Sequence, residues 1–104
     1  MASKWALVGF VKSLLMELGP FGIRANAVCP GNVESERIER VISMESAARG
    51  ISREELRAQW MLGSSMRTFV TPQDVAATVL FVCSDAGVHI SGQALAVDGH
   101  TEFV

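Results

Sequence analysis

The stretch IRANAVCPG, residues 23–31, decides the fold of this chain. Ile, Ala, Ala and Cys alternate in it with Arg24, Asn26 and Val28, and such alternation is typical of a half-buried β-strand. The Pro-Gly pair that closes the stretch is a turn signal that ends a strand. We therefore predict a short strand over residues 23–29.

A second strand is predicted within SGQALAVDG, residues 91–99, between a Ser-Gly turn and an Asp-Gly turn. It covers residues 94–98 and follows several helical patterns. Two strands that are joined by a long helical crossover are expected to be parallel, with a right-handed connection. Because two parallel strands alone do not form a stable sheet, the pattern is that of the end of an α/β domain rather than a whole one.

Residues 1–18 precede the first strand with the apolar spacing of a helix, which a Gly-Pro pair ends. The apolar residues of one face are Leu7, Val11, Leu14, Leu15 and Leu18. Trp5, Val8 and Met16 lie off that face, so we expect a helix that is buried on nearly all sides.

Residues 32–70 form a charge-rich excursion between the first strand and the last helix. More than half of the charged residues of the chain lie between Glu34 and Arg57. We predict two short amphipathic helices here, the second introduced by a capping box of Ser52 and Glu55. The charges themselves are expected to form a solvated face.

The stretch TPQDVAATVLFVCSD, residues 71–85, predicts the last helix. We expect this helix over residues 72–84, with Thr71 as its N-cap and Pro72 at its first helical position. Its apolar face consists of Val75, Val79, Leu80, Val82 and Cys83.

Composition and charge exclude several classes of function. The chain has 104 residues, a net charge of −2 and a sequence pI near 5.6, so no basic surface predicts binding to nucleic acid or to an anionic membrane. No apolar run reaches the roughly 20 residues that span a bilayer. Hydrophobic residues make up 49% of the chain and the mean hydropathy is +0.30, which is high for a chain of this size. We therefore expect the chain to bury surface against a partner copy or against further parts of a domain.

Cysteine and histidine usage predicts neither a disulfide nor a metal site. Cys29 and Cys83 lie far apart without a Cys-x-x-Cys motif, and we interpret both as reduced, buried thiols. His89 and His100 lack the spacing of metal ligands. We expect a metal-free protein of the cytoplasm.

Four motifs together carry a resemblance to a known family. Ser3 and Lys4 open an apolar helix, and IRANAVCPG, TPQDVA and SGQALAVDG follow in that order. In these motifs the chain resembles the C-terminal part of a short-chain dehydrogenase/reductase, over essentially all of its length. The resemblance implies a Rossmann-like, doubly wound parallel sheet of which this chain holds the last two strands. It also implies an oxidoreductase that uses NAD or NADP to interconvert an alcohol and a ketone by hydride transfer.

Lys4 matches the lysine of the family's Tyr-x-x-x-Lys motif. The tyrosine of that motif would fall on the residue immediately before Met1, which explains why the first helix has no capping residue of its own. Residues four apart share one helix face, and a neighbouring ammonium lowers the pKa of a phenol from its usual value of about 10. The resemblance therefore implies a catalytic role for Lys4, together with a hydrogen bond from Lys4 to the nicotinamide ribose.

Further cofactor contacts are implied after the first strand. Pro30 and Gly31 lie at its carboxyl end, where open α/β sheets bind ligands, although a plain strand-ending turn is the alternative. In the family the next residues lie along the nicotinamide, and Val33 would offer its backbone groups to the carboxamide. Ser35 stands where the family more often has threonine, so its hydroxyl is a further candidate contact.

The stretch from Glu36 to Phe69 corresponds to the substrate-binding loop of the family, with short helices of its own. Trp60, Met61 and Met66 are candidates for lining the substrate pocket. The alternative for these three residues is packing of the loop against the body of the domain.

The sequence lacks other parts of such an enzyme. It holds no Thr-Gly-x-x-x-Gly-x-Gly loop, no Asn-Asn-Ala-Gly motif and no catalytic serine, so we expect no NAD(P) to be bound by this chain alone. A truncation, a misplaced start and a genuine half-domain all remain open. Two functions follow: the C-terminal part of a dehydrogenase acting on a small alcohol or carbonyl compound, or a non-catalytic module that forms homo-oligomers through helices 3–18 and 73–83 and strand 94–97.

Overall fold

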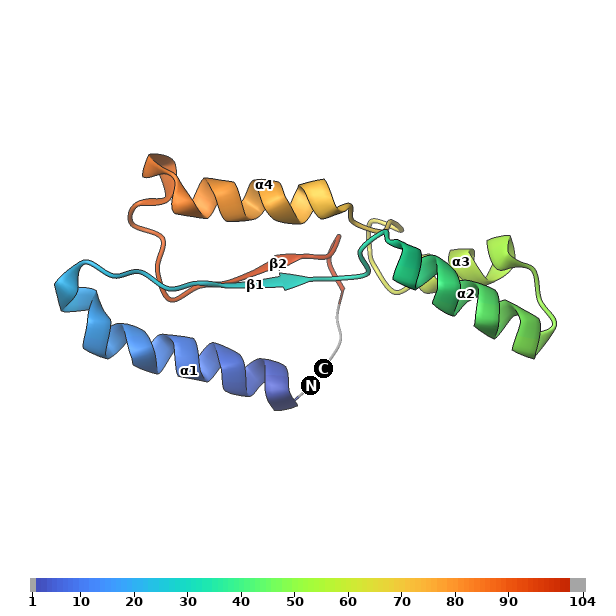
Figure 1. The fold of residues 1–104 in the computed structure, drawn as a ribbon, viewed down its shortest axis with the longest axis horizontal. Helices are drawn as coiled ribbons and strands as arrows, with labels where there is room; N and C mark the ends of the chain where they lie inside the picture. The colour runs from blue at the N-terminus through green and yellow to red at the C-terminus, as the bar shows by residue number, and fades with distance from the viewer. Residues whose placement is uncertain (1, 102–104) are drawn as a thin grey trace.

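The computed structural model describes residues 2–101 of the chain, which form two parts joined end to end. Helices α1 and α4 lie on opposite sides of a two-stranded sheet, and α2 and α3 form a helical hairpin beyond the carboxyl end of the strands (Figure 1). The Cα radius of gyration is 17.0 Å, and the extents are 56 × 28 × 23 Å. A compact domain of this length has a radius of gyration of about 13 Å, so the chain is more extended than a compact domain.

The sheet consists of β1 (Ala27–Pro30) and β2 (Ala94–Val97), which pair in parallel. Ala27 lies opposite Ala94, and Pro30 lies opposite Val97. The connection between them contains α2 (Glu36–Arg49), α3 (Arg53–Met61) and α4 (Pro72–Cys83). The parallel α/β arrangement expected from the long helical crossover is confirmed.

The first strand starts later than the alternating pattern of residues 23–29 predicts. Its beginning at Ala27 follows from the hydrogen bonds of the preceding residues, which go to an irregular segment before β2 rather than to a strand. The guanidinium of Arg24 and the side-chain amide of Asn26 both donate to the Ile90 carbonyl, at 3.0 and 2.9 Å. At the other end the amide of Gly31 donates to the Val97 carbonyl at 3.0 Å, so pairing extends through Pro30 rather than stopping at residue 29.

The second strand ends at Val97 rather than at residue 98. Asp98 already belongs to the following turn, because its carboxylate accepts a hydrogen bond from the amide of His100 at 2.8 Å. A residue that closes a turn through its side chain no longer continues the strand.

Helix α1 (Ala2–Leu18) covers one face of the sheet with a single stripe of side chains. Val8 is its buried residue, and half-buried positions on the same side are Val11, Leu14, Leu15 and Leu18. Leu7, which we expected on this face, is 59% exposed. Trp5 and Met16 are 63% and 82% exposed, so the expectation of a helix buried on nearly all sides is wrong for this chain by itself. The sheet is only two strands wide and covers one side of the helix.

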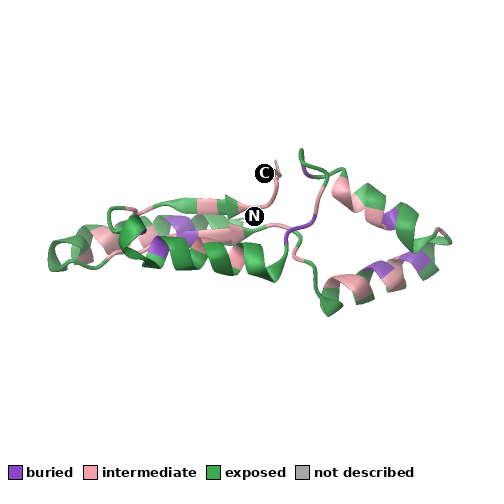
Figure 2. Cartoon of the chain, turned by 90° about the horizontal axis from the view of Figure 1, so that it is seen from above, coloured by how far each residue is buried: buried purple, intermediate pink, exposed green. Residues whose placement is uncertain are grey.

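The hairpin of α2 and α3 has a core of its own, in which Ile42 is 1% exposed, Leu56 0% and Phe69 6%. In Figure 2 the buried residues of the hairpin, in purple, are separate from the buried residues around the sheet. Ser52 caps α3 by accepting a hydrogen bond from the Glu55 amide at 3.1 Å, which is one of the two bonds of the expected capping box. The hairpin therefore packs largely against itself and against the segment that leads into α4.

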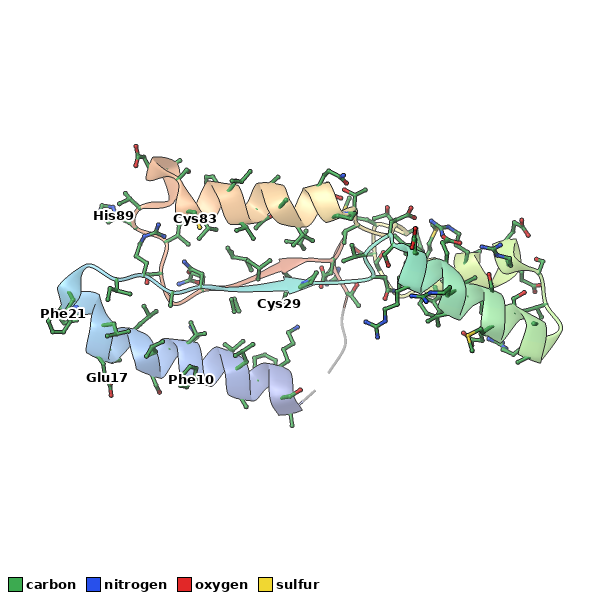
Figure 3. All side chains as sticks on the ribbon, viewed as in Figure 1. Phe10, Glu17, Phe21, Cys29, Cys83 and His89 are labelled. Carbon is green, nitrogen blue, oxygen red and sulfur yellow. The ribbon has the colours of Figure 1, made fainter. Side chains whose placement is uncertain are left out.

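The cysteines differ from the expectation of two buried thiols. Both are free, but Cys29 is half-buried and Cys83 is exposed. Cys83 borders a groove between α4 and residues 22–28 that is open to solvent, which accounts for its exposure. Figure 3 labels both residues.

A complete capping box begins α4. The Thr71 hydroxyl accepts from the Asp74 amide at 3.1 Å, and the Asp74 carboxylate accepts from the Thr71 amide at 2.8 Å. We expect Thr71→Ala to lower the free energy of unfolding by about 1 kcal/mol, because one amide of the first turn loses its acceptor. Urea denaturation followed by circular dichroism measures this change. Thr71→Ser keeps the acceptor and serves as the control, and equal stabilities of the alanine and serine variants would contradict the prediction.

Candidate functional site

Lys4 lies in a groove between α1 and β1. Ser3, Lys4 and Leu7 of the helix face Val28, Cys29 and Pro30 of the strand across a volume of about 380 Å³. Helix α1 begins beside the carboxyl end of β1, because helix and strand run in opposite directions (Figure 1). The structure thus brings two of the expected site residues, Lys4 and Pro30, to the same edge of the sheet, where open α/β folds bind ligands.

Gly31 lies against Asp98 at the carboxyl ends of the two strands. A Cβ atom on Gly31 would lie 2.6 Å from Cβ and 2.9 Å from Cα of Asp98. Both distances are shorter than carbon atoms tolerate, and the Cα belongs to backbone that has little freedom to move. The residue after Pro30 must therefore be glycine for β1 to pair with β2 up to its last residue.

Val33 forms an isolated parallel bridge with Val70. The bridge consists of a hydrogen bond from the Val70 amide to the Asn32 carbonyl, at 3.0 Å, and one from the Glu34 amide to the Val70 carbonyl, at 2.8 Å. In a parallel bridge one residue, here Val70, forms both hydrogen bonds, and they go to the two neighbours of its partner, here Asn32 and Glu34. The amide and carbonyl of the partner itself point away from the bridge. The amide and carbonyl of Val33 therefore face away from Val70.

Ser35 begins α2 as its N-cap. Its hydroxyl oxygen accepts a hydrogen bond from the Ile38 amide at 3.2 Å, and the hydroxyl hydrogen is left to donate elsewhere. Gly31, Val33 and Ser35 line a second groove of about 410 Å³ together with residues of α2 and with Trp60. The five expected site residues thus divide between two grooves at the carboxyl end of the sheet.

The three residues considered for the substrate pocket have different surroundings. Trp60 lines the second groove and also packs edge-on against Phe69, with ring centroids 6.5 Å apart. Met61 packs against the hairpin core. Met66 is 70% exposed and borders a third groove, of about 610 Å³, that extends to Asp98 and His100. Trp60 therefore both packs within the hairpin and lines a groove, so the two alternatives hold together for this residue.

One contact at this edge was not expected from the sequence. Nδ1 of His100 lies 3.0 Å from the Ser65 hydroxyl, and the Ser65 amide donates to the His100 carbonyl at 2.8 Å. His100 has a φ of 64°, a conformation that few residues other than glycine adopt. These bonds join the segment after α3 to the end of β2. Ser65 and His100 are 35 residues apart, so no local signal in the sequence marks them as a pair.

Within residues 2–101, no three His, Cys, Asp or Glu side chains come together as ligands for a metal ion. None of the helices there combines the length and the apolar character that crossing a membrane requires.

Comparison with known proteins gives a consistent result. Residues 1–100 match the family model described as enoyl-(acyl carrier protein) reductase. A ketoacyl reductase named for the monensin polyketide synthase, from Streptomyces virginiae, is 39% identical over 98 residues, which are 94% of this chain and 38% of the relative.

Two solved structures extend the comparison. A short-chain dehydrogenase family protein from Francisella tularensis has a TM-score of 0.86 and 32% identity, covering 94% of this chain and 40% of that one. A 4-hydroxyisoleucine dehydrogenase mutant, complexed with NADH and succinate, has a TM-score of 0.77 and 30% identity, covering 95% and 37%. The chain thus spans about two fifths of the length of the proteins it matches.

Proposed function

The chain belongs to the short-chain dehydrogenase/reductase family, and from this premise we propose that it supplies the C-terminal part of the active site of an NAD(P)-dependent oxidoreductase. The reaction interconverts an alcohol and a ketone, and the substrate is a small alcohol or carbonyl compound of the cytoplasm. The observation that carries the proposal is the groove in which Lys4 faces Pro30 at the carboxyl end of β1.

Lys4 acts on a tyrosine that precedes it by four residues in the whole protein. Residues at that spacing share a helix face, so the ammonium of Lys4 stabilises the phenolate and lowers the pKa of the phenol. The tyrosine then exchanges a proton with the substrate oxygen. When the cofactor is bound, Lys4 would also donate a hydrogen bond to the nicotinamide ribose.

The nicotinamide, when bound, accepts or gives the hydride. Two features of this chain fit its nicotinamide end. The backbone groups of Val33 face away from Val70, so a carboxamide would bind to them on that side without breaking the bridge. The Ser35 hydroxyl has a hydrogen left to donate. Pro30 and Gly31 place this segment at the end of the strand. The phosphates and the adenosine would be bound by parts of the whole protein other than these 104 residues.

A fusion protein tests the proposal. Residues 1–104 replace the matching C-terminal part of the Francisella tularensis protein, so that the N-terminal part of that protein supplies a dinucleotide-binding half. We expect the fusion to oxidise NADH or NADPH in the presence of a ketone, and the 104-residue chain alone to show no turnover. A folded fusion that binds NADH or NADPH but does not oxidise it in the presence of a ketone would contradict the proposal. Oxidation of NADH or NADPH by the 104-residue chain alone would contradict the proposal that other parts of the whole protein bind the phosphates of the cofactor.

Self-association is a second candidate function. Helix α1 exposes Trp5, Phe10 and Met16, and α4 exposes Leu80 and Phe81, which are large apolar side chains for a surface. We propose that the chain forms homo-oligomers through helices 3–18 and 73–83 and through strand 94–97. Sedimentation velocity of the 104-residue chain tests this, with a monomer at all concentrations as the contradicting result.

A further inference from the structure

Arg57 on α3 contacts three separate segments of the chain. One guanidinium nitrogen donates to the Glu34 carboxylate, and the other donates to the Glu39 carboxylate at 2.5 Å. The guanidinium carbon lies 4.6 Å from the centre of the Phe69 ring, a cation–π distance. One side chain thus joins α3 to α2, to the segment that follows β1 and to the segment that precedes α4.

The contacts of Arg57 are more shielded from water than those of the neighbouring arginines. Its side chain is 29% exposed, compared with 55% for Arg53 and 48% for Arg49. Charges that water screens less interact more strongly. The Phe69 ring below the guanidinium is 6% exposed, so Arg57 also covers the hairpin core. We therefore expect its ion pairs to be stronger than the surface pairs beside them.

The partners of Arg57 lie next to the Val33–Val70 bridge. Glu34 directly follows Val33, and its amide donates one of the two bonds of the bridge, to the Val70 carbonyl at 2.8 Å. Phe69 directly precedes Val70. Arg57 therefore contacts a neighbour of each residue in the bridge, one through a carboxylate and the other through an aromatic ring.

We propose that Arg57 is a positioning residue, which fixes the hairpin against the Val33–Val70 bridge and so orients the backbone groups of Val33 toward their ligand. It acts through Glu34 and Phe69 and touches no ligand itself. That the ligand is the nicotinamide end of NAD(P) rests on the proposed function. The structural part, that Arg57 orders the segment around Val33, rests only on the contacts given above.

Hydrogen exchange on the 104-residue chain, read by mass spectrometry, tests the structural part. We expect Arg57→Gln to speed exchange in the peptide of residues 31–38 by about five- to tenfold, because an ion pair and a cation–π contact no longer hold the Glu34 amide in place. Exchange around Ile42, at the centre of α2, is expected to stay within twofold of the unaltered chain, since apolar packing protects it.

Arg53→Gln is the matched control. Arg53 lies one helical turn before Arg57 and pairs with the same Glu39, but the contacts described for it include neither Glu34 nor Phe69. We expect no change in residues 31–38 for this variant. Uniformly faster exchange over residues 36–61 in Arg57→Gln would show that Arg57 only stabilises the hairpin, and would overturn the proposal. Unchanged exchange in residues 31–38 would also overturn it.

Kinetics of the fusion protein test the link to the ligand. We expect Arg57→Gln to raise the KM for NADH or NADPH by about fivefold with kcat within twofold, as for a residue that orients a binding group. Equal KM values for the fusion with and without Arg57→Gln would show that Arg57 has no effect on cofactor binding, and would overturn the link to the ligand. A fusion that fails to turn over before any substitution counts against the proposed function, whereas the exchange experiment still decides whether Arg57 positions Val33.

Discussion

Replacing Lys4 with methionine in the fusion protein is expected to lower kcat/KM for ketone reduction by about 10²- to 10⁴-fold, the usual contribution of a positioned acid–base group. Methionine keeps most of the length of the side chain but removes the ammonium. On the proposed function, loss of that charge would raise the pKa of a tyrosine four residues earlier in the fusion and would remove a donor to the ribose. Steady-state rates at saturating cofactor measure the effect.

Lys12→Met is the control for this experiment. Lys12 lies on the same helix, two turns later, and its ammonium donates to the Gly92 carbonyl at 2.7 Å. That contact lies at the opposite end of the strands from the groove of Lys4. We expect the Lys12 variant to keep its rate within threefold. If the Lys4 variant were as active as the Lys12 variant, the catalytic role proposed for Lys4 would be wrong.

Gly31→Ala is expected to lower the free energy of unfolding by about 1–3 kcal/mol, the usual cost of forcing an atom into occupied space. The added Cβ would lie 2.6 Å from Cβ of Asp98, so the ends of β1 and β2 must separate. That separation breaks the hydrogen bond from the Gly31 amide to the Val97 carbonyl. Urea denaturation of the 104-residue chain measures the loss.

Gly9→Ala provides a control with the opposite sign. Gly9 lies in the middle of α1 with open space around its Cα, since a Cβ there would meet no atom within 4 Å. Alanine in place of glycine within a helix stabilises by about 0.5–1 kcal/mol. If the Gly31→Ala and Gly9→Ala variants had the same free energy of unfolding, the inference that Gly31 lies too close to Asp98 for a larger side chain would be wrong.

The order of the elements and the parallel pairing of the strands could be predicted from the sequence. Both depend on features within short stretches, such as the Pro-Gly pair after β1 and the Thr71 cap before α4. The start of β1 could not be predicted, because Arg24 and Asn26 bond to a loop that lies 64 or more residues later in the chain. Residues 23–26 have the alternation of a strand, but within residues 2–101 the hydrogen bonds of residues 24–26 go to the irregular residues 90–93 before β2.

The candidate site could be predicted in part. The family motif identifies Lys4, and the strand end identifies Pro30, so their meeting in one groove follows from a helix and a strand that run in opposite directions. The contact between Gly31 and Asp98 and the contacts of Arg57 depend on tertiary packing. Glu34 and Arg57 are 23 residues apart, and their charges are typical of any solvated helix face until the fold brings them together.

The pairing register has a consequence for the order in which the chain folds. Asn26 and Gln93, which meet just before the strands, are 67 residues apart. Closing a loop of that length costs a length-dependent entropy of roughly 4 kcal/mol. The core of the α2–α3 hairpin joins Ile42, Leu56 and Phe69, which are much closer to one another in the chain, and contacts between closer residues form faster. We therefore expect the hairpin to form first, to shorten the loop, and the two strands to meet last.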